Sequence, residues 1–83
     1  MTTEEKYAML KSIIKPYLPE DVPETSISRD SHFIRELNIN SANLVDIVLD
    51  VEDTFNITLE NEDMESMQTV NDALKIIENK LKG

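Results

Sequence analysis

Apolar residues recur at helical spacing near the start of the chain. The positions are Tyr7, Leu10, Ile13, Ile14, Tyr17 and Leu18. Ahead of them, Thr2 and Glu5 have the spacing of a capping box, which predicts a helix that begins at about Thr3. Because proline lacks the amide that a helix interior needs, the helix should end between Lys15 and Leu18, where Pro16 and two further prolines interrupt the pattern.

A long polar loop should follow and continue to the next helical pattern. It exceeds the usual length of a connection between helices, so we expect it either to be functional or to wrap over the core. Its one apolar stretch, "HFIREL", carries Phe33, Ile34 and Leu37. We expect these three residues to anchor the loop to the core.

The clearest helical pattern runs from Ser41 to Phe55. At about 100° of rotation per residue, one face is made by Leu44, Ile47, Val48, Val51 and Phe55. A second stripe outside this face mixes apolar and acidic side chains: Ala42, Val45, Asp46, Leu49, Glu52 and Asp53. The helix should therefore expose both apolar surface and negative charge.

The remaining chain predicts a short helix and a final long one. The piece around Glu62 to Met67 is too short to be stable without tertiary contacts. Thr69 and Asp72 repeat the capping-box spacing ahead of a core face made by Val70, Ala73, Leu74, Ile77 and Leu81. Strand signals are weak. The expected fold is an all-α four-helix bundle in a single domain, residues 1–83, with three longer helices, one short helix and a long loop between the first two helices.

Composition narrows the possible partners. Eight Lys and Arg residues against seventeen Asp and Glu residues give a net charge of -9. This charge repels nucleic acids and anionic lipid, and it favours proteins with basic surfaces. The first ten residues lack the basic flank and the apolar run of a secretory signal, and no stretch is long enough to cross a membrane. We expect a cytoplasmic protein.

Few residues could support catalysis or bind a metal. The chain has no cysteine, one histidine (His32) and one glycine, at its end. The acids are scattered over positions expected to face solvent, with nothing apolar to raise a pKa. The acidic stretches lack the central glycine of a calcium-binding loop. We therefore expect neither an enzyme nor a metal site.

Ser41 allows two interpretations at the start of its helix. Serine is a common N-cap, and spacing alone favours that structural role. A phosphodiester at the same position would also be stabilised, because free backbone amides and the positive end of the helix dipole lie there. The residues alone leave both roles open.

From Phe33 to Ile77 the sequence "FIRELNINSANLVDIVLDVEDTFNITLENEDMESMQTVNDALKII" resembles the acyl carrier protein family without a gap, and the similarity covers nearly the whole chain. The resemblance implies that Ser41 receives 4'-phosphopantetheine from coenzyme A, whose thiol then holds an acyl group as a thioester. The resemblance also agrees with the absence of cysteine, because the attached group would bring the reactive thiol.

The resemblance also implies roles for the long helix and its surroundings. Its exposed stripe would meet basic patches of a phosphopantetheinyl transferase and of acyl-processing enzymes, through Ala42, Val45, Asp46, Leu49, Glu52 and Asp53. Such contacts should form quickly and weaken with salt, as suits a carrier that works as a monomer and leaves each enzyme after one step. The residues expected to line an acyl cavity are Leu44, Ile47, Val48, Val51, Met64, Met67 and Leu74.

Three features depart from the family pattern. The usual Asp-Ser-Leu motif is Asn40-Ser41-Ala42 here, which removes one charge and one apolar side chain at the transferase site. The glycine ahead of it is Asn38, a residue that enters the left-handed backbone region readily. Acids that would gather around cations are replaced by Arg35, Asn40, Asn43, Asn56 and Asn61, so little stabilisation by calcium or magnesium is expected.

The cargo and the pathway stay open. The leading hypothesis is a discrete carrier for fatty acid, polyketide or a related specialised acyl biosynthesis. A related hypothesis has the thioester hold an aminoacyl or peptidyl group. A third, from another class, is an unmodified adapter that binds a basic partner protein while Ser41 only caps its helix.

Overall fold

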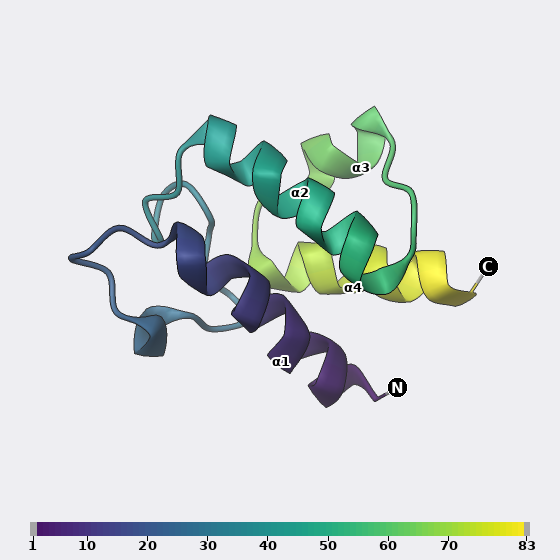
Figure 1. The fold of residues 1–83 in the computed structure, drawn as a ribbon, viewed down its shortest axis with the longest axis horizontal. Coiled ribbons are helices and arrows are strands. Elements are labelled where there is room, and N and C mark those ends of the chain that lie inside the picture. Colours follow the sequence, from purple (N-terminus) through teal and green to yellow (C-terminus); the bar gives the residue numbers. More distant parts are fainter. Residues whose placement is uncertain (1, 83) are drawn as a thin grey trace.

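Four α-helices form the fold of the computed structural model, which describes residues 2–82. They are α1 (Thr3–Ile14), α2 (Ser41–Phe55), α3 (Asn61–Ser66) and α4 (Val70–Lys82). Two single-turn 3₁₀ helices, η1 (Lys15–Tyr17) and η2 (Glu24–Ser26), lie between α1 and α2. No strand occurs in this part of the chain, which confirms the all-α prediction. Figure 1 shows the long loop and the start of α2 at one end of the bundle, opposite the start of α1 and the end of α4.

The predicted capping boxes set the starts of α1 and α4. The Thr2 side chain accepts a hydrogen bond from the Glu5 amide at 3.1 Å, and the Glu5 carboxylate accepts one from the Thr2 amide at 3.2 Å. Thr69 and Asp72 make the same reciprocal pair, with both hydrogen bonds at 3.1 Å. Each pair satisfies amides that have no partner inside the helix. Both boundaries are confirmed.

A single core lies between the helices and the loop. Every helix except α3 contributes fully buried side chains to it, among them Leu10, Ile14, Ile47, Val51, Val70 and Ile77. Two of the predicted core residues are instead exposed: Ile34 keeps 45 % of its accessible surface and Leu81 keeps 41 %. Ile34 follows buried Phe33 in a turn and faces outward, and Leu81 lies in the last turn of α4 beside an open groove. Both predictions were wrong.

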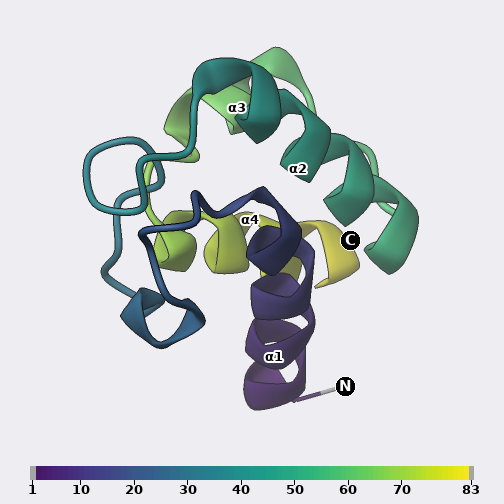
Figure 2. The same ribbon diagram turned by 60° about the vertical axis from the view of Figure 1, so that its left-hand side comes forward.

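The long loop is wrapped over the core, which is one of the two possibilities predicted from its length. Phe33 and Leu37 are buried, and so are Ile27 and Ile39, which the sequence analysis did not single out. Figure 2 shows the loop passing beside the start of α4. The loop is held there by backbone hydrogen bonds from Phe33 to Gln68, from Val70 to Ser31 and from Asn71 to Arg29, at 3.0, 3.0 and 2.8 Å. These bonds fix the backbone that leads toward α2.

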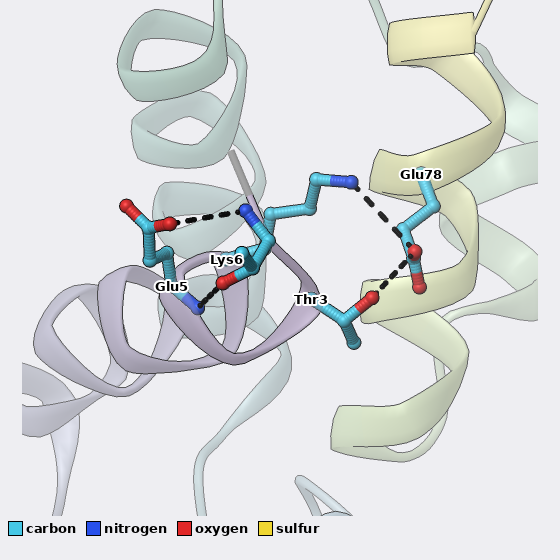
Figure 3. Close-up of polar contacts among 5 residues, drawn as sticks. Thr3, Glu5, Lys6 and Glu78 are labelled. Atoms are coloured by element: carbon cyan, nitrogen blue, oxygen red, sulfur yellow. Dashed lines mark hydrogen bonds and ion pairs between the residues drawn. The ribbon is translucent and has the colours of Figure 1, made fainter.

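Polar contacts join α1 to α4 near the other end of the bundle (Figure 3). The Thr3 hydroxyl donates to the Glu78 carboxylate at 3.0 Å, and the Lys6 ammonium lies 3.7 Å from the same oxygen. A further ion pair joins Lys80 of α4 to Asp63 of α3 at 3.0 Å. The carboxylates on this side of the molecule are thus used to hold helices together.

Candidate functional site at the start of α2

Asn40, rather than Ser41, caps α2. Its backbone is extended, with φ -75° and ψ 164°, and its side-chain oxygen accepts a hydrogen bond from the Asn43 amide at 2.8 Å. Ser41 is the first residue of the helix itself. The structural role weighed for Ser41 was therefore wrong, because asparagine caps as well as serine does and stands one position earlier.

The Ser41 hydroxyl is left free for chemistry. Ser41 is exposed, and its hydroxyl makes no hydrogen bond to any group of residues 2–82. Just before the helix, Asn38 adopts the left-handed region with φ 54°, a conformation that asparagine enters readily. Ile39 is buried, and its amide donates to the Phe33 carbonyl at 2.9 Å. A fixed backbone therefore presents an unengaged serine to solvent.

The start of α2 suits a phosphate ester on that serine. The amides of Ser41 and Ala42 have no hydrogen-bond acceptor within the described residues, and the first turn of the helix contains no acid. Unpaired amides and the positive end of the helix dipole both favour a negative group. The residues present here thus fit a covalently attached phosphodiester.

The outer face of α2 carries the predicted mixture of apolar and acidic side chains. Val45 and Leu49 expose 53 % and 54 % of their surface, and Ala42, Asp46 and Asp53 are exposed beside them. Neither Asp46 nor Asp53 is in an ion pair with a Lys or Arg of residues 2–82. Both charges are free to act on another molecule.

Two other acids of α2 are engaged by the chain itself. Glu52 is only partly exposed, and its carboxylate accepts a hydrogen bond from the Leu59 amide at 2.8 Å, which ties α2 to the loop before α3. Asp50 accepts a hydrogen bond from the Tyr17 hydroxyl at 2.8 Å. That bond, helped by partial burial and by the charges of Asp50 and Asp46, raises the pKa of Tyr17 above its usual value. The engagement of Asp50 was not foreseen, because it depends on where η1 packs.

A pocket of about 200 Å³ lies beside the first half of α2. Three of the seven residues expected around an acyl cavity line it: Leu44, Met64 and Met67. The other four, Ile47, Val48, Val51 and Leu74, are packed in the core and are not among its lining residues. Phe33 and Ile34 also line it, and sequence reasoning missed them because their place depends on how the loop folds back.

His32 lies at the edge of the same pocket. Its Nδ1 atom accepts hydrogen bonds from the Ile34 and Arg35 amides, both at 3.3 Å. The imidazole thus supports the turn that places Phe33 and Ile34.

In residues 2–82 no three or more His, Asp or Glu side chains are grouped so that they could hold a metal ion. No helix in this range is long and apolar enough to cross a membrane.

Comparisons with known proteins agree on one family. A family model described as "Phosphopantetheine attachment site" matches residues 10–77, a range that includes Ser41. The acyl carrier protein of Thermotoga maritima is 36% identical over 78 residues, which are 94% of each chain. That of an Exiguobacterium species is 36% identical over 81 residues, covering 98% of this chain and 100% of the relative. That of Coprothermobacter proteolyticus is 35% identical over 98% of this chain and 96% of the relative.

Proposed function

The chain belongs to the acyl carrier protein family, and we propose that Ser41 is the residue that carries its 4'-phosphopantetheine. Members of this family are carriers and not enzymes, and their prosthetic group is attached covalently. When attached, the group supplies the thiol that holds an acyl chain as a thioester. This chain has no cysteine that could supply one.

One observation carries the assignment of Ser41. The serine stands at the start of α2 with a free, exposed hydroxyl, while the neighbouring Asn40 makes the capping hydrogen bond. The amides of Ser41 and Ala42 are unpaired within residues 2–82, so a phosphate on Ser41 would gain donors without breaking an existing contact. The adapter hypothesis loses the structural role that it gave to Ser41, because Asn40 makes the capping bond.

We propose that partner enzymes dock on the outer face of α2. The docking surface consists of Ala42, Val45, Asp46, Leu49 and Asp53, which are all exposed. Glu52 is left out of this surface because its carboxylate binds the Leu59 amide. The partners would be a phosphopantetheinyl transferase and acyl-processing enzymes with basic patches, met by a monomeric carrier in the cytoplasm.

The cargo we propose is an acyl group of fatty acid, polyketide or related specialised biosynthesis. The pocket beside α2 supports this choice, since apolar Phe33, Leu44 and Met67 line it. An aminoacyl group, with its charged amine, would gain less from such a lining.

The test is the intact mass of the wild-type protein after incubation with coenzyme A, magnesium and a broad-specificity phosphopantetheinyl transferase. We expect a gain of one phosphopantetheine, and fragment ions should place it on Ser41. A transferase from the same organism is the second arm, because Asn40 and Ala42 depart from the family motif. No gain with either transferase, or a gain on another serine, would overturn the proposal.

A further inference from the structure

The turn formed by residues 32–37 is held in a fixed conformation ahead of α2. The His32 carbonyl accepts hydrogen bonds from the Glu36 and Leu37 amides, both at 3.0 Å. The Nδ1 atom of His32 accepts two more from amides of the same turn, both at 3.3 Å. Phe33 is fully buried and anchors the turn to the core. Because the turn is ordered before any partner arrives, binding to it costs little conformational entropy.

Two neighbouring side chains of the 32–37 turn face solvent. Ile34 keeps 45 % of its surface exposed. Arg35 is exposed as well, and its guanidinium is in no ion pair with an Asp or Glu of residues 2–82. A guanidinium can bind a carboxylate through two parallel hydrogen bonds, and an exposed apolar side chain gains from contact with apolar surface. The turn therefore offers one cationic and one apolar contact to another molecule.

The 32–37 turn lies close to the start of α2. Ile34 lines the same pocket as Leu44, which is one helical turn after Ser41. The Phe33 carbonyl accepts a hydrogen bond from the Ile39 amide at 2.9 Å, which ties the turn to the backbone just before the helix. An enzyme that acts on Ser41 must therefore approach the turn as well as α2.

The charge of the turn is opposite to that of the docking surface on α2. That surface carries Asp46 and Asp53, whereas Arg35 is the last Lys or Arg of the sequence before Lys75. A partner that is basic over its whole contact area would attract α2 and repel Arg35. Repulsion of this kind discriminates between partners that otherwise bind alike. The partner that fits both regions has a carboxylate at the edge of its basic patch.

We propose that the 32–37 turn is a second docking point for the phosphopantetheinyl transferase of the same organism. An Asp or Glu of that enzyme pairs with Arg35, and an apolar depression beside it receives Ile34. Asn40 and Ala42 offer a transferase less charge and less apolar surface than the family motif does, and the turn offers both close by. This inference rests on the proposed attachment at Ser41.

Loading kinetics of Arg35→Glu test the pairing. The measurement is kcat/KM for transfer from coenzyme A, with the transferase of the same organism and with a broad-specificity transferase. Arg35→Glu makes the carrier more negative, so general attraction to a basic enzyme predicts faster loading. The proposed pair predicts the opposite: kcat/KM with the transferase of the same organism should fall about fivefold or more, and so should its ratio to the value with the broad-specificity enzyme.

Matched variants separate the pair from net charge and from folding. Lys75→Glu makes the same charge change at an exposed position of α4 that is in no ion pair with the other described residues, and it should leave the ratio unchanged. Arg35→Gln removes the charge without adding another and should show a smaller fall. Ile34→Ala should raise KM with little change in kcat. The melting temperature of each variant should stay within about 2 °C of the wild type, because both positions of the turn are exposed.

The outcomes distinguish the two proposals. If neither transferase loads the wild-type protein, the proposed function fails and this inference fails with it. If only the broad-specificity enzyme loads it, or if the ratio is unchanged in Arg35→Glu or falls equally in Lys75→Glu, only this inference is overturned. A fall in the ratio that is confined to Arg35→Glu and Arg35→Gln, at an unchanged melting temperature, supports it.

Discussion

The two halves of this small protein use charge in opposite ways. Residues 36–74, which contain α2 and α3, carry ten of the seventeen acids and no Lys or Arg. All eight basic residues lie before or after this segment, mostly on α1 and α4. The proposed docking surface on α2 lies within this acidic segment.

The contacts on each side support this view. On the α1 and α4 side, Glu78 binds both Thr3 and Lys6 (Figure 3), and its carboxylate contributes to the fold. On α2, Asp46 and Asp53 point to solvent without a cation from residues 2–82. Exposed charges of one sign stabilise little and raise association rates with a basic partner. The carboxylate of Glu78 therefore supports the fold, whereas those of Asp46 and Asp53 are available for recognition.

Reversing charges on α2 should produce the largest effect. Asp46→Lys with Asp53→Lys should slow association with a phosphopantetheinyl transferase by about tenfold or more, because steering by opposite charge is lost. The free energy of unfolding should change little. Association rates would be measured by stopped flow at several salt concentrations.

The matched control changes the net charge equally at another place. Glu20→Lys with Asp21→Lys alters two exposed acids in the loop after η1. It should slow association much less than the α2 variant. Equal effects from both pairs would mean that net charge matters and the α2 face does not.

Removing the cap of α2 should have the next largest effect. Asn40→Ala loses the hydrogen bond to the Asn43 amide and should cost about 1 kcal/mol in the free energy of unfolding. Asn40→Asp keeps an acceptor and should retain most of this stability. Urea unfolding of both variants is the measurement, and an Asn40→Ala protein as stable as the wild type would show that another residue caps the helix.

On the opposite side, Glu78→Ala should lower stability without affecting recognition. It removes the contacts with Thr3 and Lys6, at a cost of about 0.5–1 kcal/mol in urea unfolding. Glu24→Ala, which loses only the exposed pair with Lys15, should cost less. Slower association of the Glu78→Ala protein with the transferase would contradict the assignment of recognition to the outer face of α2.

Acid should reveal a smaller contribution from Asp63. The Glu60 amide, and then Lys80, lower the pKa of Asp63 from its usual 3.8. A carboxyl whose pKa is lowered by folding stabilises the protein above its ordinary pKa, and the effect disappears as the pH falls through the lowered value. Asp63→Asn should therefore be less stable than the wild type at pH 7 and equally stable near pH 2. Urea midpoints across this range are the measurement. Glu62→Gln, on the same helix, is the control for the loss of one carboxylate from α3.

Helix positions could be predicted from the sequence because they depend on local rules. Apolar spacing located α2 and α4, and capping boxes located the starts of α1 and α4. Local rules fail where two neighbours are equally suited to one role, as with Asn40 and Ser41 at the start of α2. In the structure Asn40 is the residue that caps α2, and the hydroxyl of Ser41 is left without a hydrogen bond.

The site could be predicted only in part because several of its features depend on tertiary packing. Helical periodicity placed Val45 and Leu49 on the surface, and they are exposed. The same periodicity could not show that Glu52 reaches the Leu59 amide seven residues later. Helical periodicity also could not predict that Ile34 lines the pocket, because this depends on how the loop packs beside α2 and α3.

The most direct test of the account is Ser41→Ala, examined for both loading and stability, with Ser12→Ala on α1 as the control. The account predicts that Ser41→Ala gains no phosphopantetheine in an intact mass measurement, while its melting temperature stays within about 2 °C of the wild type, because Asn40 makes the capping bond. The control should be loaded like the wild type. Loading of Ser41→Ala would contradict the assignment of the attachment site. A fall in its melting temperature of about 4–8 °C would instead show that Ser41 supports the helix after all.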